Sequence, residues 1–326
     1  MEYKFGSFNM QNISENAYDE QNGKMIEKRD FSIIAQIIKD ESFDVVALQE
    51  VLSLGAAIEY LVKNYLPGYD MKWEKPPMRE GGDKRGEGFA FLWKKRRLKL
   101  ADSNDSHGKE EFKPRILGLS DGCDTTSFIR PPYFARFVPK NGGFFEFRVI
   151  SVHLYFGSEN SSDILKRKEE YDYIIKNIYP TISTKRKYGN NREAYTIVMG
   201  DYNLNLRKYR GEAEKNINSQ TYISGEYHTV DQSIVTVQDE LTTLKKPKDS
   251  DDDNNKRGYS QNYDHFTFDA RVFIKERIGY KARRIDAVRK YYNDDFEEYR
   301  AKVSDHVPIS LRIIMNEPIY MNGGEV

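Results

Sequence analysis

The stretch YTIVMGDYNLN, residues 195–205, joins an apolar strand pattern to a pair of polar side chains. Residues 195–199 are a run of mostly apolar and β-branched side chains, which is typical of a buried strand. Asp201 and Asn203 follow almost directly. Because neighbouring residues of a strand point to opposite faces, these two side chains share a face if the strand continues, and Tyr202 points away. The stretch therefore predicts a buried strand that ends in a carboxylate and an amide.

Four other apolar segments lie next to polar side chains of similar kinds. These are Asn9 after residues 5–8, Glu50 after residues 43–49, His153 after residues 145–152, and Asp305 with His306 before residues 307–311. Functional sites of layered α/β proteins gather at strand ends. A single asparagine or aspartate in such a place is usually a turn residue. The prediction of a shared site therefore depends on all five positions occurring together.

The residue types at these positions suit chemistry on a phosphate with a divalent cation. Mg²⁺ prefers oxygen ligands and needs only one or two carboxylates besides the substrate. Glu50 is the best candidate ligand, because a carboxylate after a wholly apolar strand needs a partner to offset its desolvation. Asp201 and Asn203 can orient a water and hold a phosphate oxygen. The two histidines, His153 and His306, can donate to a phosphate or carry a proton.

The remaining pattern indicates a mixed α/β architecture without internal repeats. We expect further strands at residues 3–8, 87–93, 134–138 and 310–314, and helices at residues 24–39, 54–65 and 162–178. Residues 9–22 read as a polar loop. Strands separated by helices, with several hairpin-like pairs, favour packed mixed sheets over a bundle or a barrel.

Composition is consistent with one globular domain over residues 1–316. The chain has 326 residues, of which 38% are hydrophobic and 31% charged, and no apolar run is long enough to span a bilayer. The segment 245–257 is expected to be a flexible surface insertion and residues 317–326 a loose tail. The acidic run 251–253 within the insertion is not interpreted as a calcium site, because no further ligands follow at the spacing of a calcium loop.

Charge and cysteine content bear on partners and on location. The chain has 51 basic and 51 acidic residues, so we do not expect a large basic surface for binding nucleic acid. A local basic rim around the site is compatible with this charge balance. Cys123 is the single cysteine, and no export signal is visible at the start of the sequence. We therefore expect a cytoplasmic protein, although a secreted protein whose leader had been removed would look the same.

Seven segments together resemble the endonuclease/exonuclease/phosphatase superfamily, and within it deoxyribonuclease I and its relatives. The segments fall in the family's order from residue 3 to about residue 314. They are FGSFNMQN (5–12), DVVALQEV (44–51), GEGFAFLW (86–93), ISVHL (150–154), MGDYNLN (199–205), NYDHF (262–266) and VSDHVPI (303–309). The combination of GDxN with a distant SDHxP is specific. The resemblance implies a deoxyribonuclease I-like, four-layer sandwich of two packed mixed β-sheets flanked by helices.

The resemblance also implies roles for a metal centre and for the attacking water. Glu50 and Asn9 resemble metal ligands, and Asp305 completes or supports their site. Mg²⁺ is the expected ion, with Mn²⁺ or Ca²⁺ as alternatives. Asp201 resembles the acid that orients or deprotonates the attacking water, and Asn203 the amide that holds a phosphate oxygen.

Two acid–histidine pairs are implied in the same way. His306 resembles the histidine that contacts the scissile phosphate, with Asp264 as its carboxylate partner. Glu87 and His153 resemble the second pair of deoxyribonuclease I-type members. A carboxylate beside a histidine fixes its tautomer and stabilises its charged form.

The substrate implied by the resemblance is nucleic acid, DNA in preference to RNA, with no membrane partner. Arg130, in SFIRPPYFARF (127–137), is similar to an arginine that reaches a backbone phosphate. Tyr263 also follows the nuclease pattern, and the resemblance implies that it binds the substrate phosphate as well. Arg85 stands where the related nucleases carry a tyrosine for the minor groove. The alternatives are a phosphatase or lipid phosphodiesterase of the same superfamily, of inositol phosphate or sphingomyelin type, or a non-catalytic module that keeps the fold.

Overall fold

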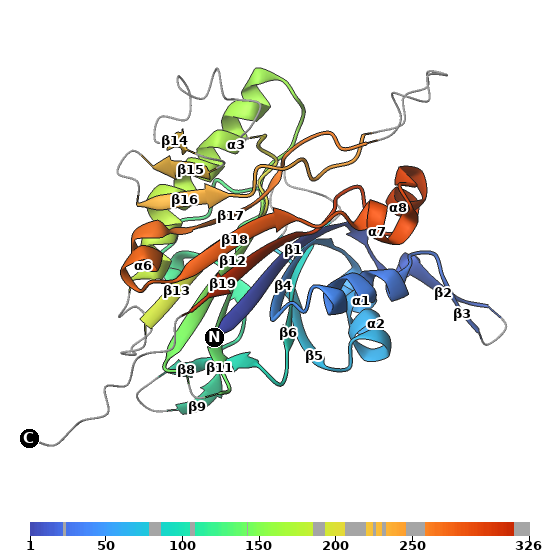
Figure 1. Ribbon diagram of the computed structural model, residues 1–326, viewed down its shortest axis with the longest axis horizontal. Coiled ribbons are helices and arrows are strands. Elements are labelled where there is room, and N and C mark those ends of the chain that lie inside the picture. The colour runs from blue at the N-terminus through green and yellow to red at the C-terminus, as the bar shows by residue number, and fades with distance from the viewer. Residues whose placement is uncertain are drawn as a thin grey trace, which may run out of the picture.

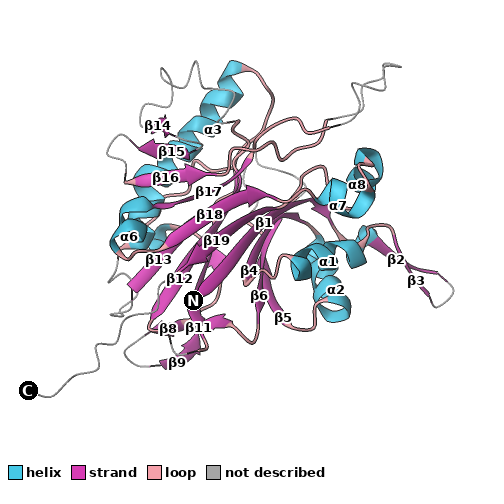
Figure 2. Ribbon diagram, viewed as in Figure 1, coloured by secondary structure: helices cyan, strands magenta, loops and turns pink. Residues whose placement is uncertain are grey.

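Two mixed β-sheets pack face to face and carry helices on their outer faces (Figures 1 and 2). The computed structural model describes residues 1–21, 24–77, 86–104, 108–141, 143–184, 193–205, 220–223, 226–229, 233–245 and 258–315. The expected four-layer arrangement is confirmed. No helix within these ranges is both long and apolar enough to cross a lipid bilayer.

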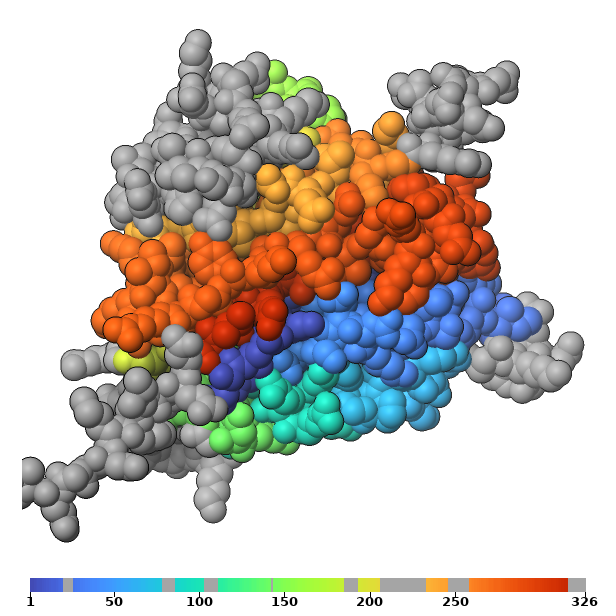
Figure 3. All heavy atoms as spheres, in the orientation of Figure 1, coloured from blue at the N-terminus to red at the C-terminus, as the bar shows by residue number. Residues whose placement is uncertain are grey.

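The first sheet is built from both ends of the sequence. Its order is β18 (Gly279–Arg284), β19 (Ile309–Ile314), β1 (Glu2–Ile13), β4 (Val45–Val51), β6 (Gly88–Lys94) and β5 (Tyr69–Glu74). β1 and β4 are parallel, whereas the other neighbours are antiparallel. The pairing of β1 with β19 brings the first and last described strands side by side, as the blue and red surfaces of Figure 3 show.

The second sheet comes mainly from the middle of the chain. Its order is β10 (Arg115–Ile116), β11 (Tyr133–Pro139), β12 (Phe145–His153), β13 (Glu193–Asp201), β17 (Asp264–Asp269), β16 (Ile234–Val237), β15 (Glu226–Thr229) and β14 (Gln220–Ile223), and β7 (Leu98–Leu100) pairs with β11. β12 and β13 are its parallel pair. Each sheet thus contains one central parallel pair.

Helices and two small hairpins complete the chain. The helices are α1 (Phe31–Asp40), α2 (Ala56–Tyr65), α3 (Ser161–Tyr173), α4 (Tyr179–Ser183), α6 (Ala270–Lys275), α7 (Ala287–Tyr292) and α8 (Phe296–Lys302). A π-helical turn (Ile174–Ile178) joins α3 to α4, and single 3-10 turns lie at Glu15–Ala17, Ser53–Gly55 and Leu119–Asp121. The hairpins are β2 (Tyr18–Gln21) with β3 (Lys24–Glu27) and β8 (Asp102–Asn104) with β9 (Gly108–Glu111).

Strand alternation divides the core into three layers. Along β4, Val45 and Ala47 face the other sheet, whereas Val46 and Leu48 pack under α1 and α2. Both faces are buried, which explains why this strand reads as a continuous apolar run. The second sheet alternates likewise, and its outer face packs against α3 and α4. Because the two sheets are packed, the inner-facing side chains of both share one central layer.

The predicted loop at residues 9–22 and the start of the helix predicted at residues 24–39 are wrong. β1 continues to Ile13 because Met10 and Ile13 are buried, and the positive φ angles of Gln11 and Asn12 interrupt its pairing. Residues 18–21 and 24–27 then pair as the β2–β3 hairpin. The helix begins only at Phe31, after the Asp30 carboxylate caps its first turn by accepting the Ile33 N–H.

The other predicted elements lie within a few residues of the observed ones, except that the segment 162–178 ends in the π-helical turn. The expected insertion, apart from Lys245, and the expected tail lie outside the described residues, as does Arg85.

Candidate active site

The register of the second sheet places three of the predicted residues in one row. His153 ends β12 and lies opposite Asp201 on β13, and Asp201 lies opposite Asp264 on β17. All three follow the inner-facing alternation of their strands, as Met199 and Phe266 do in the core. The site is therefore the continuation of the central layer beyond the last apolar side chains.

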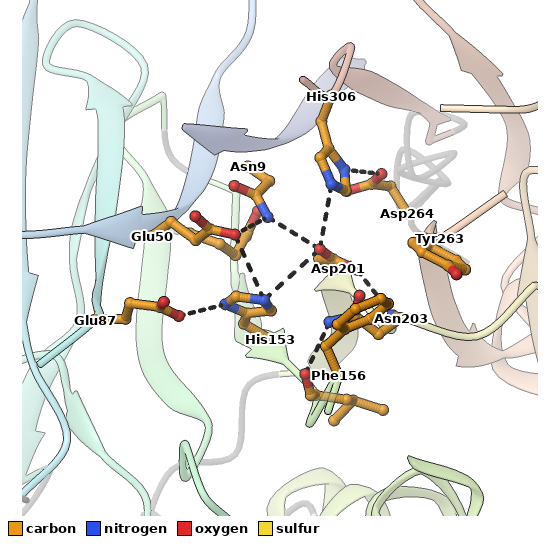
Figure 4. A network of polar contacts seen from close by, with 12 residues as sticks. Asn9, Glu50, Glu87, His153, Phe156, Asp201, Asn203, Tyr263, Asp264 and His306 are labelled. Atoms are coloured by element: carbon orange, nitrogen blue, oxygen red, sulfur yellow. Dashed lines mark hydrogen bonds and ion pairs between the residues drawn. The ribbon is translucent and has the colours of Figure 1, made fainter. Parts of the chain in front are cut away.

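The first sheet supplies the facing groups. Asn9 is an inner residue of β1 and pairs in register with Gln49 on β4. Glu50 comes one residue later, where strict alternation would turn it outward. An irregularity in the β4–β6 pairing and a φ of 56° at Glu50 change its direction. Figure 4 shows its carboxylate directed at Asn9 and His153. The irregularity is thus what brings Glu50 into the site.

Asn9 links the carboxylates of the two sheets. Its Nδ2 donates to Glu50 Oε1 and to Asp201 Oδ2, and both hydrogen bonds are 2.9 Å long (Figure 4). Its Oδ1 accepts the Gln11 N–H at 2.9 Å. The side chain is fully buried. In this arrangement the amide nitrogen, rather than the oxygen, faces the carboxylates. Direct ligation of a cation by Asn9 would require the amide to turn over, so its role as a ligand stays a prediction.

His153 faces three carboxylates. Its Nδ1 lies 3.4 Å from Glu87 Oε2, and its Nε2 lies 3.8 Å from Glu50 Oε1 and 3.7 Å from Asp201 Oδ2. Glu87 precedes β6 and is almost completely buried. The structure thus brings Glu87 next to His153 Nδ1, and His153 Nε2 faces Glu50 and Asp201. The catalytic role of this acid–histidine pair stays a prediction.

His306 forms the second pair with Asp264. The Asp264 carboxylate contacts His306 Nδ1 at 2.8 Å, and His306 Nε2 lies 3.6 Å from Asp201 Oδ2. Burial lowers the pKa of His306, but the carboxylates of Asp264 and Asp201 outweigh burial and raise this pKa well above its ordinary value. The pair therefore favours the charged form of the imidazole.

Asp201 is the common neighbour of both histidines. Burial raises the pKa of its carboxyl from 3.8 to about 7; charged His306 opposes this rise, and Asp264 adds to it. Asn203 donates its backbone N–H to Asp201 Oδ1 at 2.8 Å and its side-chain Nδ2 to the Leu154 carbonyl at 2.9 Å. A carboxyl with a pKa near neutrality can take a proton from water at the pH of the cell.

Gly200 explains why the strand can come this close to its neighbour. Its φ is +152°, and a Cβ atom at this position would lie 2.0 Å from the Val152 carbonyl oxygen. No other residue type fits this close approach. The glycine therefore sets the separation between the strands that carry His153 and Asp201.

Two overlapping groups of side chains could hold a cation. Ligand atoms of Glu50, His153 and Asp201 lie within 4.8 Å of one another, and so do those of Asp201, Asp264 and His306. Carboxylate oxygens beside an amide suit a hard divalent cation. The donor set around Glu50 therefore fits a metal such as Mg²⁺, although nothing in it selects one ion.

Asp305 lies at the margin of these groups. Its carboxylate belongs to neither of the two groups among the described residues, but it acts electrostatically on both His306 and Arg29. Its backbone carbonyl accepts the Leu244 N–H at 2.8 Å. This placement is compatible with a supporting role, and the role of Asp305 as a ligand stays a prediction.

Arg130, expected to reach a backbone phosphate, is buried next to His153 and Glu87. It is 9% exposed, and its guanidinium donates to the carbonyls of His153 at 3.0 Å and Leu154 at 2.8 Å and to Glu87 Oε2 at 3.0 Å. Arg130 thus holds Glu87 against His153. A direct contact of Arg130 with a substrate phosphate stays a prediction.

Tyr263 lies at the rim of the site, where its hydroxyl donates to Glu159 Oε1 at 2.8 Å. Its contact with a substrate phosphate likewise stays a prediction.

Sequence reasoning missed the polar bridge that joins the sheets beneath the site. Gln49 Nε2 donates to Ser151 Oγ at 3.0 Å, and Ser7 Oγ donates to Gln49 Oε1 at 3.3 Å, all within the core. The glutamine that ends the run FDVVALQ was the available signal. The buried Arg167 and Glu170 of α3 were also missed, because charged side chains of an amphipathic helix are expected on its solvent-facing side.

Comparisons with known proteins identify the fold. No protein-family model matches the chain, and no curated protein is similar to it in sequence. The structure of D. rerio TDP2 complexed with single strand DNA product has a TM-score of 0.55 and 15% identity, and the match covers 96% of this chain and 99% of that one. An endonuclease/exonuclease/phosphatase family protein from Bacteroides thetaiotaomicron has a TM-score of 0.52 and 14% identity, with 97% and 96% covered.

A further protein described by the same family, from Bacteroides vulgatus, has a TM-score of 0.52 and 17% identity, with 97% of this chain and 100% of that chain covered. These likenesses confirm the resemblance at the level of the fold. The chain has the deoxyribonuclease I-like fold of endonuclease/exonuclease/phosphatase proteins.

Proposed function

We propose that this chain is a divalent-metal-dependent phosphodiesterase that hydrolyses the backbone of nucleic acid, acting as an endonuclease on DNA. The observation that carries the proposal is the position of Asp201 Oδ2. This atom lies 2.9 Å from Asn9 Nδ2, 3.7 Å from His153 Nε2 and 3.6 Å from His306 Nε2. A buried carboxylate between two acid-backed imidazoles is suited to work on an anionic phosphate group.

The cation would be held by Glu50, with Asn9 and Asp305 completing or supporting its site. When bound, a divalent cation would neutralise negative charge on the phosphate. The remaining roles belong to the chain's own residues. Asp201 orients a water and takes its proton as the water oxygen forms a bond to phosphorus. The bond from phosphorus to the leaving oxygen breaks in line, and that oxygen takes up a proton from solvent.

The two histidines stabilise the charge that develops on the phosphate. His306 is kept protonated by Asp264 and donates to a phosphate oxygen, and His153, backed by Glu87, donates from the other side. Asn203, whose side-chain amide is held by the Leu154 carbonyl, would hold a phosphate oxygen through the remaining hydrogen of that amide. Loss of one such donor typically reduces the rate by about 10²–10³-fold.

A basic hollow beside the site supports a polyanionic substrate. It is lined by Gln11, Asn12, Arg29, Glu297, Arg300 and Ala301. Arg29 donates to the carbonyls of Met10 and Gln11, directly after Asn9, and its charge interacts with the carboxylates of Glu50 and Asp305. Arg29, whose charge interacts with Glu50, and Arg300, whose charge interacts with Asp305, suit a neighbouring backbone phosphate. The D. rerio TDP2 neighbour, whose structure contains a single-stranded DNA product, is compatible with this choice.

The test is incubation with supercoiled plasmid, linear duplex DNA, single-stranded DNA and RNA, each with Mg²⁺ or with EDTA. We expect Mg²⁺-dependent nicking of plasmid by the wild-type protein and no nicking by Asp201→Ala or His306→Ala. Asp70→Asn, which changes an exposed carboxylate on the edge strand β5, is the matched control and should nick normally. Release of inorganic phosphate from monoesters without any nicking would replace the proposal with a phosphatase.

A further inference from the structure

Phe156 presents an apolar ring at the rim of a polar site. It follows β12 by three residues and is 37% exposed, and Figure 4 shows it beside Asn203. Its ring centroid lies 6.4 Å from that of Tyr263, at an interplanar angle of 60°. An isolated exposed aromatic side chain needs no functional explanation. The contacts beneath this ring distinguish it from such a residue.

Arg167 fixes the inner side of the ring. Its guanidinium carbon lies 4.7 Å from the Phe156 ring centroid, and its Nε donates to the Phe156 carbonyl at 3.0 Å. The same guanidinium donates to the carbonyls of Ser158 and, at 2.8 Å, Asn203. Arg167 is only 1% exposed. One buried side chain therefore positions both the ring and the residue proposed to hold a phosphate oxygen.

Tyr263 and the turn after Phe156 are also fixed by contacts within the protein. Glu159 Oε1 accepts the Tyr263 hydroxyl at 2.8 Å and lies 3.4 Å from Arg167 Nη1. Gly157 has a φ of +58°, and a Cβ atom there would lie 2.5 Å from the Tyr155 hydroxyl oxygen. The chain therefore turns directly after Phe156 in a conformation that favours glycine. The ring is held in place before any substrate arrives, which reduces the entropy lost on binding.

We propose that Phe156 is a stacking platform for the nucleobase of a nucleotide that adjoins the scissile phosphate. The inference rests on the proposed function and specifies which part of the substrate is recognised besides its phosphate. A phosphate held at Asn203 leaves the attached nucleoside next to the ring, and every nucleobase offers a planar face to an aromatic side chain. Stacking tolerates different bases, so this contact favours nucleic acid over base-free phosphate esters without reading a sequence.

The binding test uses a single-stranded oligonucleotide that contains 2-aminopurine, whose fluorescence is quenched by stacking. Asp201→Ala serves as the background so that the strand is not cut. We expect quenching on binding, and loss of this quenching when Phe156→Ala or Phe156→Leu is added. Leucine keeps an apolar contact with Arg167 but lacks the π face, so it separates stacking from packing. Phe144→Ala removes a 69% exposed phenylalanine next to the opposite end of β12 and should quench like the background protein.

The kinetic test compares oligonucleotides that carry either a base or an abasic nucleotide beside the cleaved bond. For the base-bearing strand, Phe156→Leu should lower kcat/KM by about 5- to 100-fold, and Phe156→Trp should retain most of it. For the strand that is abasic at the contacted position, wild type and Phe156→Leu should be equal. An equal loss on both strands, or quenching that does not depend on Phe156, would overturn the proposal.

The two proposals can fail separately. Quenching that depends on Phe156 without cleavage of any phosphodiester would refute the proposed activity and leave the stacking contact in place. Cleavage of base-bearing and abasic strands at rates that Phe156 does not affect would refute the stacking contact alone.

Discussion

Replacing Asp201 with asparagine should stabilise the metal-free protein at pH 8 while abolishing its activity. Burial raises the pKa of this carboxyl from 3.8 to about 7, so the folded state binds a proton at a pH where the unfolded chain has lost it. For a carboxyl with a raised folded pKa, stability is fully present below the unfolded pKa and decreases as the pH rises toward the folded pKa. Wild type should therefore lose stability from this group between about pH 4 and pH 7, and the variant should not.

The size of the effect follows from that shift of about 3 pKa units. At about 1.36 kcal/mol per unit, the ionised carboxylate destabilises the fold by up to about 4 kcal/mol above pH 7. The asparagine variant loses part of this free energy, because asparagine cannot make every interaction that the carboxylate makes. One of the two hydrogen bonds accepted from Asn9 and Asn203 loses its acceptor, at about 1 kcal/mol, and the attraction to charged His306 is lost. A net stabilisation of about 1–3 kcal/mol at pH 8 remains.

Urea unfolding in EDTA at pH 4.5 and pH 8 measures this difference. EDTA is essential, because a cation that binds only the folded wild type would stabilise it and hide the effect. Asp70→Asn, which removes an exposed carboxylate, is the control and should match wild type at both pH values. If Asp201→Asn were less stable than wild type at pH 8, or if its advantage did not grow between the two pH values, burial would not be what raises this pKa.

Three further outcomes test other parts of the structure. Glu146→Gln should lower the free energy of unfolding in urea by about 3–5 kcal/mol. Arg136 and Arg148 lie 2.6 and 2.5 Å from the Glu146 carboxylate, and the variant would leave both guanidinium charges in the core without a counter-charge. A free energy of unfolding within about 1 kcal/mol of wild type would contradict this. Gly200→Ala should abolish nicking and reduce soluble yield, since its Cβ would collide with a carbonyl of β12; a normally active variant would show that the strands separate freely. The rate of hydrolysis at saturating Mg²⁺ should increase with pH and level off above an apparent pKa at or below about 7. Burial raises the pKa of Asp201 to about 7, and a bound cation would lower it. A rate that falls between pH 5 and pH 7 would argue against Asp201 as the base.

Local sequence patterns predicted the elements where the pattern and the burial coincide. The strand at residues 195–199 and the helix at residues 54–65 were found, because apolar runs and helical spacing report directly on which face is buried. The β2–β3 hairpin was missed because Ile26 is 43% exposed and belongs to a small projecting element. Helical spacing between Ile26 and Phe31 arose by coincidence across a boundary that the Asp30 cap sets.

The candidate site residues could be named from the sequence, because strands end where their apolar runs end and polar side chains follow. Alternation even determines that Asn9 and Asp201 point inward. Their hydrogen bond, however, joins residues 192 positions apart and exists only because the two sheets pack so that β1 lies next to β13. The direction of Glu50, the bridge through Gln49 and the raised pKa of Asp201 likewise depend on a strand irregularity and on burial. Such properties arise from packing between distant segments, which no local pattern encodes.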